Sequence, residues 1–168
     1  MHPTLLPFLV PAMLAPQASA LPGAVEARPG LFVVLGTPGA ETFAGLKAAG
    51  ITHVINLRTD AEGDFSTDAA TTKASGAAYD RCPLDREPTT AALDAFRAKV
   101  RALPKGARVL IHCASGNRVA GALYTTWVLD EGMSEDAALA LAKKAGLKSP
   151  VTEAAAKAYV AAKKTAKG

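Results

Sequence analysis

One short stretch of the chain reads Val109-Leu110-Ile111-His112-Cys113-Ala114-Ser115-Gly116-Asn117-Arg118. The β-branched and apolar run over 108–111 predicts a buried strand of a parallel sheet. Apolar side chains then recur at helical spacing, which predicts a helix that begins at Asn117 or Arg118. The loop between them therefore leads from the carboxyl end of a strand to the amino end of a helix, where open α/β sheets bind their ligands.

The composition of this loop favours a reactive cysteine beneath a bound anion. The first backbone N–H groups of a helix lack partners and carry partial positive charge, and Gly116 lets such groups curl into a nest. A helix N-terminus and the guanidinium of Arg118 would each stabilise a thiolate at Cys113. We expect His112 to point away from the pocket and to hold the loop through a backbone hydrogen bond. The alternative interpretation is a buried structural cysteine beside a surface arginine.

The rest of the chain alternates strands with helices. We expect strands at 31–35, 52–57, 77–81 and 108–111, and helices at 38–49, 66–75, 90–103, from 117 onward, 135–145 and 150–164. A chain of 168 residues fits one domain. The pattern predicts a single α/β domain with a central, mostly parallel sheet of four to five strands and helices on both faces.

The N-terminus resembles a targeting segment. Residues 4–15 are apolar with proline interruptions, and Ala18-Ser19-Ala20 fits a small-x-small cleavage site. We therefore expect a signal peptide at 1–20, a Pro/Gly linker at 21–30 and the domain at 31–168, in a periplasmic or secreted bacterial protein. The apolar run is too short for a membrane span. A disordered extension of a cytosolic protein is the alternative.

Composition excludes several classes of function. The hydrophobic content of 49% supports a packed core, and the formal charge of +4 reflects a Lys-rich C-terminal segment of the kind that forms a solvated helix face. Basic patches interleaved with aromatic residues are absent from the sequence, so nucleic-acid binding is not expected. The three histidines are scattered, and no ligand spacing or dinucleotide loop occurs, so neither a metal nor a cofactor is expected.

The motif His112-Cys113-x-x-Gly116, followed closely by Arg118, resembles the phosphate loop of the cysteine-dependent protein tyrosine and dual-specificity phosphatases. The Gly-Ile-Thr-His-Val-Ile-Asn-Leu-Arg segment at 50–58 resembles a strand motif of the dual-specificity group. The layout over 31–150 is similar to bacterial beta-lactamase hydrolase-like phosphatase domains, which are related to the phosphatase domain fused to NAD kinase. The resemblance implies hydrolysis of phosphate monoesters through a cysteinyl-phosphate, with a phosphorylated small molecule or phosphoprotein as partner.

Two departures from that family keep other functions open. Only four residues separate Cys113 from Arg118, where the phosphatase signature has five. Rhodanese-type sulfurtransferases have the shorter loops, and a tight loop would suit a persulfide on Cys113 received from a sulfane-sulfur donor. Val119 stands where these phosphatases usually carry Ser or Thr to help the thiolate leave. The alternatives are therefore a sulfurtransferase and a catalytically weak oxyanion-binding module.

The resemblance also implies a general acid, an Asp on the loop before the cysteine strand. Asp85 lies in that loop, with Asp80 as a less well placed alternative. Asp85 as a solvated carboxylate paired with Arg86 is the structural interpretation. We expect Arg58, which follows a strand on the same sheet edge, to add positive potential to the substrate site or to pair with a carboxylate.

Cys82 is the only other cysteine and is predicted to follow a strand at the same sheet edge as Cys113. In an oxidising compartment two thiols on one edge are candidates for a reversible disulfide, and some phosphatases of the resembled family use such a partner cysteine. The alternative is that Cys82 is a small buried hydrophobic residue. The oligomeric state is not predicted by any feature of the chain.

Overall fold

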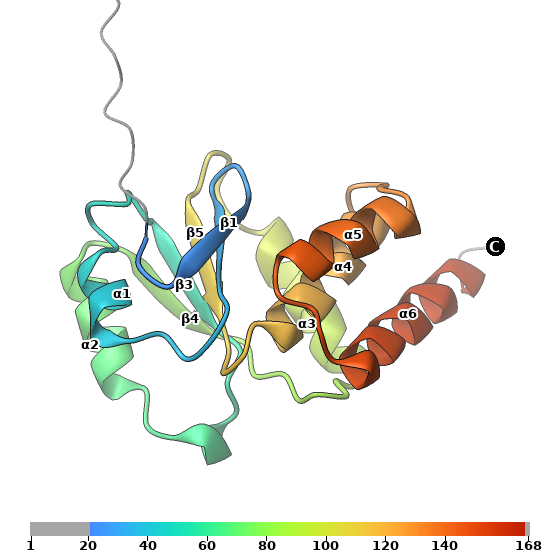
Figure 1. Ribbon diagram of the computed structural model, residues 1–168, viewed down its shortest axis with the longest axis horizontal. Helices are drawn as coiled ribbons and strands as arrows, with labels where there is room; N and C mark the ends of the chain where they lie inside the picture. Colours follow the sequence, from blue (N-terminus) through green and yellow to red (C-terminus); the bar gives the residue numbers. More distant parts are fainter. Residues whose placement is uncertain (1–20, 167–168) are drawn as a thin grey trace, which may run out of the picture.

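The computed structural model describes residues 21–166, and the predicted signal peptide lies outside the described residues. The described chain forms one sheet with helices on both sides (Figure 1). Its strands are β1 (Ala24–Arg28), β2 (Leu31–Val34), β3 (His53–Asn56), β4 (Ala78–Arg81) and β5 (Val109–His112). Its helices are α1 (Ala40–Ala44), α2 (Ser66–Ala74), α3 (Thr90–Arg101), α4 (Asn117–Leu129), α5 (Glu135–Lys144) and α6 (Pro150–Thr165), with a 3₁₀ turn at Asp60–Glu62.

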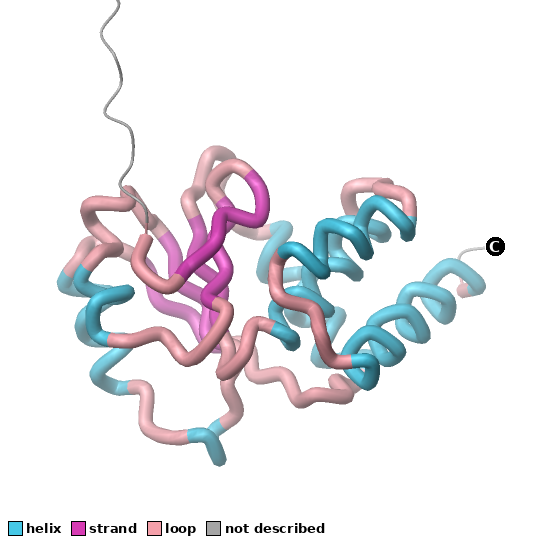
Figure 2. The backbone as a smooth tube through the Cα atoms, viewed as in Figure 1, coloured by secondary structure: helices cyan, strands magenta, loops and turns pink. Residues whose placement is uncertain are grey.

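The strands lie in the order β1-β2-β5-β3-β4, and only the β1–β2 pair is antiparallel. The cysteine strand β5 is therefore central, which explains why its side chains are buried on both faces. The predicted α/β fold with a mostly parallel sheet is confirmed, and Figure 2 shows the helices gathered on either side of the strands.

Side chains of β5 alternate between two cores. Val109 and Ile111 belong to the larger core, which α3, α4, α5 and α6 cover. Leu110 belongs to the smaller core, which includes Phe43 of α1. Burial on both faces leaves the carboxyl ends of the parallel strands as the open edge for a site. Within residues 21–166, no helix combines the length and apolar character that a membrane crossing requires.

The predicted linker at 21–30 is wrong, because β1 occupies Ala24–Arg28 and pairs with β2. The proline and glycine residues that indicated a linker instead flank the strand in two turns. Val25 packs against the larger core, and Leu21 is itself buried. A short edge strand between two turns has too little apolar alternation to be distinguished from a linker in sequence.

The first predicted helix is also shorter than expected. Helix α1 spans Ala40–Ala44, whereas the predicted helix ran over 38–49. The chain continues to Gly50 as turns rather than as helix. The other helices follow their predicted bounds closely, and the Thr89 hydroxyl caps α3 by accepting from the backbone N–H of Ala92.

Candidate active site

Cys113 lies fully buried at the end of β5, where the loop curls around its sulfur. The Gly116 N–H donates to Sγ of Cys113 at 3.1 Å. Gly116 has a φ of +79°, and a Cβ there would lie 3.3 Å from both the carbonyl oxygen of Val34 and the Cα of Leu35. A side chain at this position would therefore be strained by the positive φ and would press on the backbone at the end of β2, which favours glycine here.

The other amides of the loop point to an anion site. Within residues 21–166 the backbone N–H groups of Ala114, Ser115, Asn117 and Arg118 have no hydrogen-bond acceptor in the protein. The last two belong to the first turn of α4, whose N–H groups cannot bond within the helix. The predicted nest of free amides above the sulfur is consistent with this arrangement.

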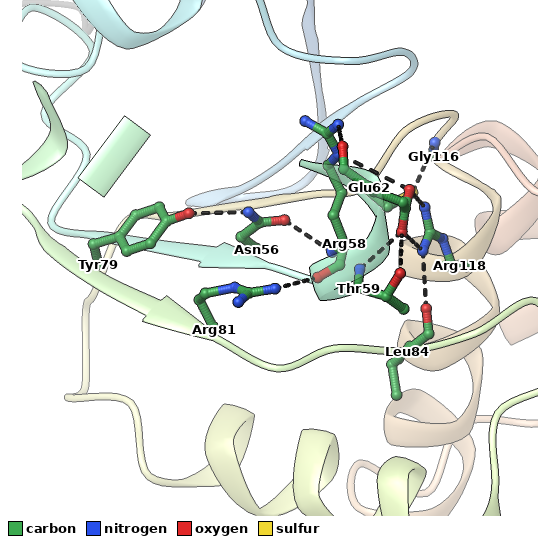
Figure 3. A network of polar contacts seen from close by, with 10 residues as sticks. Asn56, Arg58, Thr59, Glu62, Tyr79, Arg81, Leu84, Gly116 and Arg118 are labelled. Carbon is green, nitrogen blue, oxygen red and sulfur yellow. Dashed lines mark hydrogen bonds and ion pairs between the residues drawn. The ribbon is translucent and has the colours of Figure 1, made fainter. Parts of the chain in front are cut away.

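Arg118 is held by a carboxylate that the sequence did not suggest as a partner. Its Nη1 donates to Oε2 of Glu62 and its Nη2 to Oε1, each at 2.6 Å, and Nη1 also donates to the carbonyl of Leu84 at 2.9 Å (Figure 3). The guanidinium side chain is only 10% exposed. The hydrogen bond to Glu62 is the main cause of a raised Arg118 pKa, and the nearby sulfur of Cys113 adds to it.

A count of donors shows what Arg118 can still bind. A guanidinium has five N–H groups, and three of them are used by Glu62 and Leu84. The remaining two are on Nε and Nη2, which form one edge of the planar group. That edge is a two-pronged donor, the geometry that matches two oxygens of a tetrahedral anion.

Glu62 is itself fixed on its loop. Its carboxylate accepts from the backbone N–H of Thr59 at 2.8 Å and from its hydroxyl at 3.1 Å, in a capping box. The bond to Arg118 is the largest cause that lowers the Glu62 pKa to about 2, against the opposing effect of burial. The Thr59-x-x-Glu62 spacing is a capping-box signal that would have located the carboxylate, although not its partner.

Arg58 supports this loop from behind rather than lining the pocket. Its Nη2 donates to the carbonyl of Glu62 at 2.6 Å, and its guanidinium lies 4.6 Å from the centre of the Phe65 ring. Its backbone N–H donates to Oδ1 of buried Asn56 at 2.8 Å. The predicted contribution of Arg58 to substrate binding is therefore indirect, through the carboxylate-bearing loop.

An open pocket of about 850 Å³ lies above the cysteine loop. Its lining residues come from three loops and the start of α6: Thr59, Glu62, Asp85, Arg86, Glu87, Ala114, Ser115, Asn117, Arg118, Ser149 and Thr152. The predicted phosphate loop and the predicted acid thus meet in one pocket. Among residues 21–166, no group of three or more His, Cys, Asp or Glu side chains is arranged to hold a metal ion.

Asp85 is the better placed of the two candidate acids. It is exposed at the pocket and forms no ion pair within the described residues, so the predicted pair with Arg86 is not seen. Asp80 points elsewhere, because its Oδ1 accepts from Nζ of Lys99 at 3.0 Å. Asp85 thus lines the pocket, whereas Asp80, on β4, does not.

His112 does not hold the loop through its ring. Both ring nitrogens are buried without a hydrogen-bond partner in the described structure, so the predicted backbone bond is wrong. The ring instead packs edge-to-face on Phe43, with centroids 5.9 Å apart. Burial lowers the His112 pKa to about 4, so the ring is neutral at neutral pH. Its place is in the core beneath the site.

Both cysteines are free thiols, and the sheet register keeps them apart. Asn56 pairs with Arg81 on one side and with His112 on the other, so Leu57 lies between Cys82 and Cys113. Two strand spacings separate the cysteine Cα atoms by about 10 Å, more than a disulfide spans without backbone movement. The disulfide that the sequence left open is not present, and burial raises the Cys82 pKa, as expected for the alternative of a small buried residue.

The side chain of Asn117 braces the loop against α6, a role that the sequence did not indicate. Its Oδ1 accepts from the backbone N–H groups of Lys148 and Ser149, each at 2.7 Å, and its Nδ2 donates to the Ser115 hydroxyl at 3.2 Å. The side chain of Asn117 therefore faces the protein, and only its backbone N–H is free for an anion.

Solved structures share this fold. A DUF442 protein from Shewanella putrefaciens CN-32, a candidate phosphatase, is 25% identical, with a TM-score of 0.65 over 83% of this chain and 91% of its own. TpbA from P. aeruginosa, as a Cys-to-Ser variant bound to phosphotyrosine, is 20% identical, with a TM-score of 0.65 over 88% and 90%. The catalytic domain of the PP-IP phosphatase SIW14 from S. cerevisiae is 13% identical, with a TM-score of 0.67 over 82% and 85%.

No protein-family model matches the sequence, and no curated protein matches it. The narrower resemblance to beta-lactamase hydrolase-like phosphatase domains stays a prediction. The wider one is confirmed by the neighbouring structures together with the loop that carries Cys113 and Arg118. The chain therefore has the fold of the cysteine-dependent protein tyrosine and dual-specificity phosphatases, to which these neighbours belong.

Proposed function

We propose that the protein hydrolyses phosphate monoesters through a cysteinyl-phosphate on Cys113. One observation carries the proposal. Loop residues with unpaired backbone N–H groups and Arg118 with its unpaired Nε–Nη2 edge line one pocket beside the Cys113 loop, within a fold that known phosphatases share. A thiolate there is a nucleophile with an oxyanion site already formed around it.

In the first step the Cys113 thiolate attacks phosphorus. An S–P bond forms while the bond between phosphorus and the ester oxygen breaks, and the leaving oxygen takes a proton from the Asp85 carboxyl. The Nε–Nη2 edge of Arg118 and the loop amides hold the equatorial oxygens as charge shifts among them. Because Glu62 and Leu84 already fix the guanidinium, little reorganisation is needed at the moment of reaction.

In the second step water attacks the cysteinyl-phosphate. It gives a proton to the Asp85 carboxylate, the S–P bond breaks, and inorganic phosphate leaves the restored thiolate. Val119 is fully buried at the position where the resembled family places a hydroxyl that helps this thiolate leave. We therefore expect the second step to limit the rate.

The pocket supports an ester with a substantial leaving group. It is open, and its rim combines the exposed charges of Asp85, Arg86 and Glu87. TpbA was solved with phosphotyrosine and PTPMT1 with PI(5)P, so the fold accommodates both an aryl phosphate and a lipid phosphate. An aryl phosphate is the simplest first substrate for this chain.

A paired assay tests the proposal. Hydrolysis of an aryl phosphate and sulfur transfer from thiosulfate to cyanide are measured on the full chain, on Cys113→Ser and on Cys82→Ser. The proposal predicts phosphatase activity that Cys113→Ser abolishes and Cys82→Ser retains. Sulfur transfer without phosphatase activity would instead identify the protein as a sulfurtransferase that carries a persulfide on Cys113. Oxyanion binding without either activity would identify it as a binding module.

We further propose that residues 1–20 act as an export signal, which would place the enzyme in the periplasm or outside the cell. The support is the apolar run followed by Ala18-Ser19-Ala20. N-terminal sequencing of protein exported from a bacterial host tests this, and a mature chain that begins at Leu21 is the expected result. A chain that retains Met1 and stays in the cytosol would contradict it.

A further inference from the structure

The loop at 58–65 carries Glu62 but contains little regular structure, only the 3₁₀ turn Asp60–Glu62. It leads from the end of β3 to the start of α2, and Phe65 immediately precedes that helix. Phe65 is 6% exposed, although the residues on either side of it are exposed. The ring is therefore the point at which this loop is fastened to the body of the protein.

Two guanidiniums lie against that one ring. The Cζ atom of Arg58 is 4.6 Å from the ring centre, and the Cζ atom of Arg81 is 4.7 Å from it. Both distances lie within the range of a favourable cation–π interaction with the ring face. We call Arg58, Phe65 and Arg81 together the Phe65 anchor.

Both guanidiniums also bind the backbone of the loop. Nη2 of Arg81 donates to the carbonyl of Arg58 at 2.8 Å, and Nη2 of Arg58 donates to the carbonyl of Glu62 at 2.6 Å (Figure 3). Arg81 also pairs with Asp60. Glu62, whose carboxylate binds Arg118, is thus itself bound at its backbone carbonyl by Arg58 of the Phe65 anchor.

We propose that the Phe65 anchor is a positioning device that fixes the direction of the free edge of Arg118, and Phe65 is its central positioning residue. The inference rests on the proposed function only in taking Arg118 as the ligand of the substrate anion. The path runs from the Phe65 ring to Arg58, then to the Glu62 carbonyl and carboxylate, and finally to Arg118. Without the ring, the loop is free to shift, and Glu62 takes the guanidinium with it.

A shift of the Arg118 guanidinium should affect the binding of anions more than that of neutral molecules. A displaced guanidinium weakens the recognition of an oxyanion, but it leaves the fold of the Cys113 loop unchanged, because Gly116 and Asn117 hold that loop from the other side. A neutral reagent that the sulfur attacks senses the change only through the fraction of Cys113 present as thiolate, which affects both reagents equally. The ratio of anionic to neutral reagent therefore measures the orientation of Arg118 without requiring turnover.

Alkylation of Cys113 by iodoacetate and by iodoacetamide supplies that ratio. In both reactions the sulfur displaces iodide and forms a thioether, and peptide mapping separates Cys113 from Cys82. The wild-type chain should favour iodoacetate relative to the ratio shown by free glutathione. Phe65→Leu should lower its ratio about tenfold, the equivalent of one charge-assisted hydrogen bond. Phe65→Tyr, which keeps the ring, should stay within about twofold of wild type.

The chain offers a matched control in Phe32, which is 5% exposed and carries the guanidinium of Arg108 at 5.0 Å from its ring. Phe32→Leu should leave the ratio unchanged. If Phe65→Leu does not fold, Arg81→Lys should lower the ratio, whereas Arg108→Lys should not. The proposal would be overturned if the ratio stayed unchanged in folded Phe65→Leu or in Arg81→Lys. It would also be overturned if the ratio fell equally in Phe32→Leu, or if the wild-type ratio equalled that of glutathione. Absent aryl phosphatase activity, by contrast, would count against the proposed function alone.

Discussion

The carboxylate of Glu62 occupies both terminal nitrogens of Arg118, at 2.6 Å on each side, across 56 residues of sequence. The pair places a fixed negative charge beside an anion site, which costs affinity for the substrate. In return it fixes the side chain of Arg118 with its Nε–Nη2 edge unpaired. Orientation that is fixed in advance benefits the transition state more than the ground state.

Glu62→Gln should therefore separate binding from catalysis. We expect KM for an aryl phosphate to stay level or fall, because a repulsive charge is removed, and kcat to fall about tenfold, because one strong hydrogen bond that orients Arg118 is weakened. Steady-state kinetics measure both. Glu87→Gln, which removes a charge from the same pocket without touching Arg118, is the control. A rise in KM with an unchanged kcat would contradict the orienting role.

The pH dependence of this pair has a defined sign. The folded pKa of Glu62 is about 2, below its ordinary value of 4.5. The stabilisation from the pair is therefore complete above pH 4.5 and is lost only as the pH falls toward 2. A loss of stability between pH 5 and 6.5 must therefore arise mainly from another group.

His112 is the group that we expect to act in that range. Its folded pKa is about 4 and its ordinary value is 6.5, so the unfolded chain binds the extra proton between these pH values. Stability should be full above pH 6.5 and fall by about 3 kcal/mol as the pH approaches 4. Urea unfolding of wild type and His112→Leu across this range measures the effect, and the variant should lack that part of the slope. An unaltered slope in the variant, with His53→Leu as the reference, would contradict the assignment.

Asp85→Asn should show a leaving-group dependence. A general acid contributes roughly 10²–10⁴-fold when the leaving oxygen needs a proton, and little when it does not. We therefore expect a large loss of kcat with phenyl phosphate and a small loss with p-nitrophenyl phosphate, measured in parallel. Asp80→Asn, whose carboxylate pairs with Lys99, should affect neither substrate. An equal loss with both substrates would assign Asp85 to binding instead.

Gly116→Ala should abolish activity by forcing the loop off the sulfur. The variant places a side chain at a φ of +79° and 3.3 Å from the β2 backbone. The backbone strain alone costs about 1–2 kcal/mol. Gly132→Ala is the matched control, because Gly132 has a φ of +70° with open space around it. Thermal unfolding and kinetics should show strain in both variants but loss of activity only at Gly116. Full activity in Gly116→Ala would contradict the tight loop.

The Cys113 loop could be predicted because its signals are local. A buried strand, a glycine and a helix start follow one another within ten residues, and their order already indicates a nest of amides beneath an anion. The alternation of strands and helices likewise predicted the parallel sheet. Strand β1 was missed because a five-residue edge strand between turns has almost the same composition as a linker.

The partner of Arg118 could not be predicted because tertiary packing chooses it. Glu62 is distant in sequence, and several acidic residues compete for the role. The predicted hydrogen bond of His112 was wrong for a related reason. The ring is buried against Phe43, and its nitrogens have no hydrogen-bond partner in the described structure. Arg58 was placed on the correct sheet edge, but its direction depends on Phe65, a residue with no chemical signature in the sequence.

The central claim is that Cys113 carries the phosphoryl group during turnover. Rapid acid quenching of the enzyme with an aryl phosphate, followed by mass spectrometry of its peptides, tests it most directly. Because Val119 supplies no hydroxyl to help the thiolate leave, we expect the intermediate to accumulate, with one phosphoryl group on the peptide that contains Cys113 and none in Cys113→Ser. Turnover with no phosphoryl group on that peptide, or with one on another residue, would contradict the account.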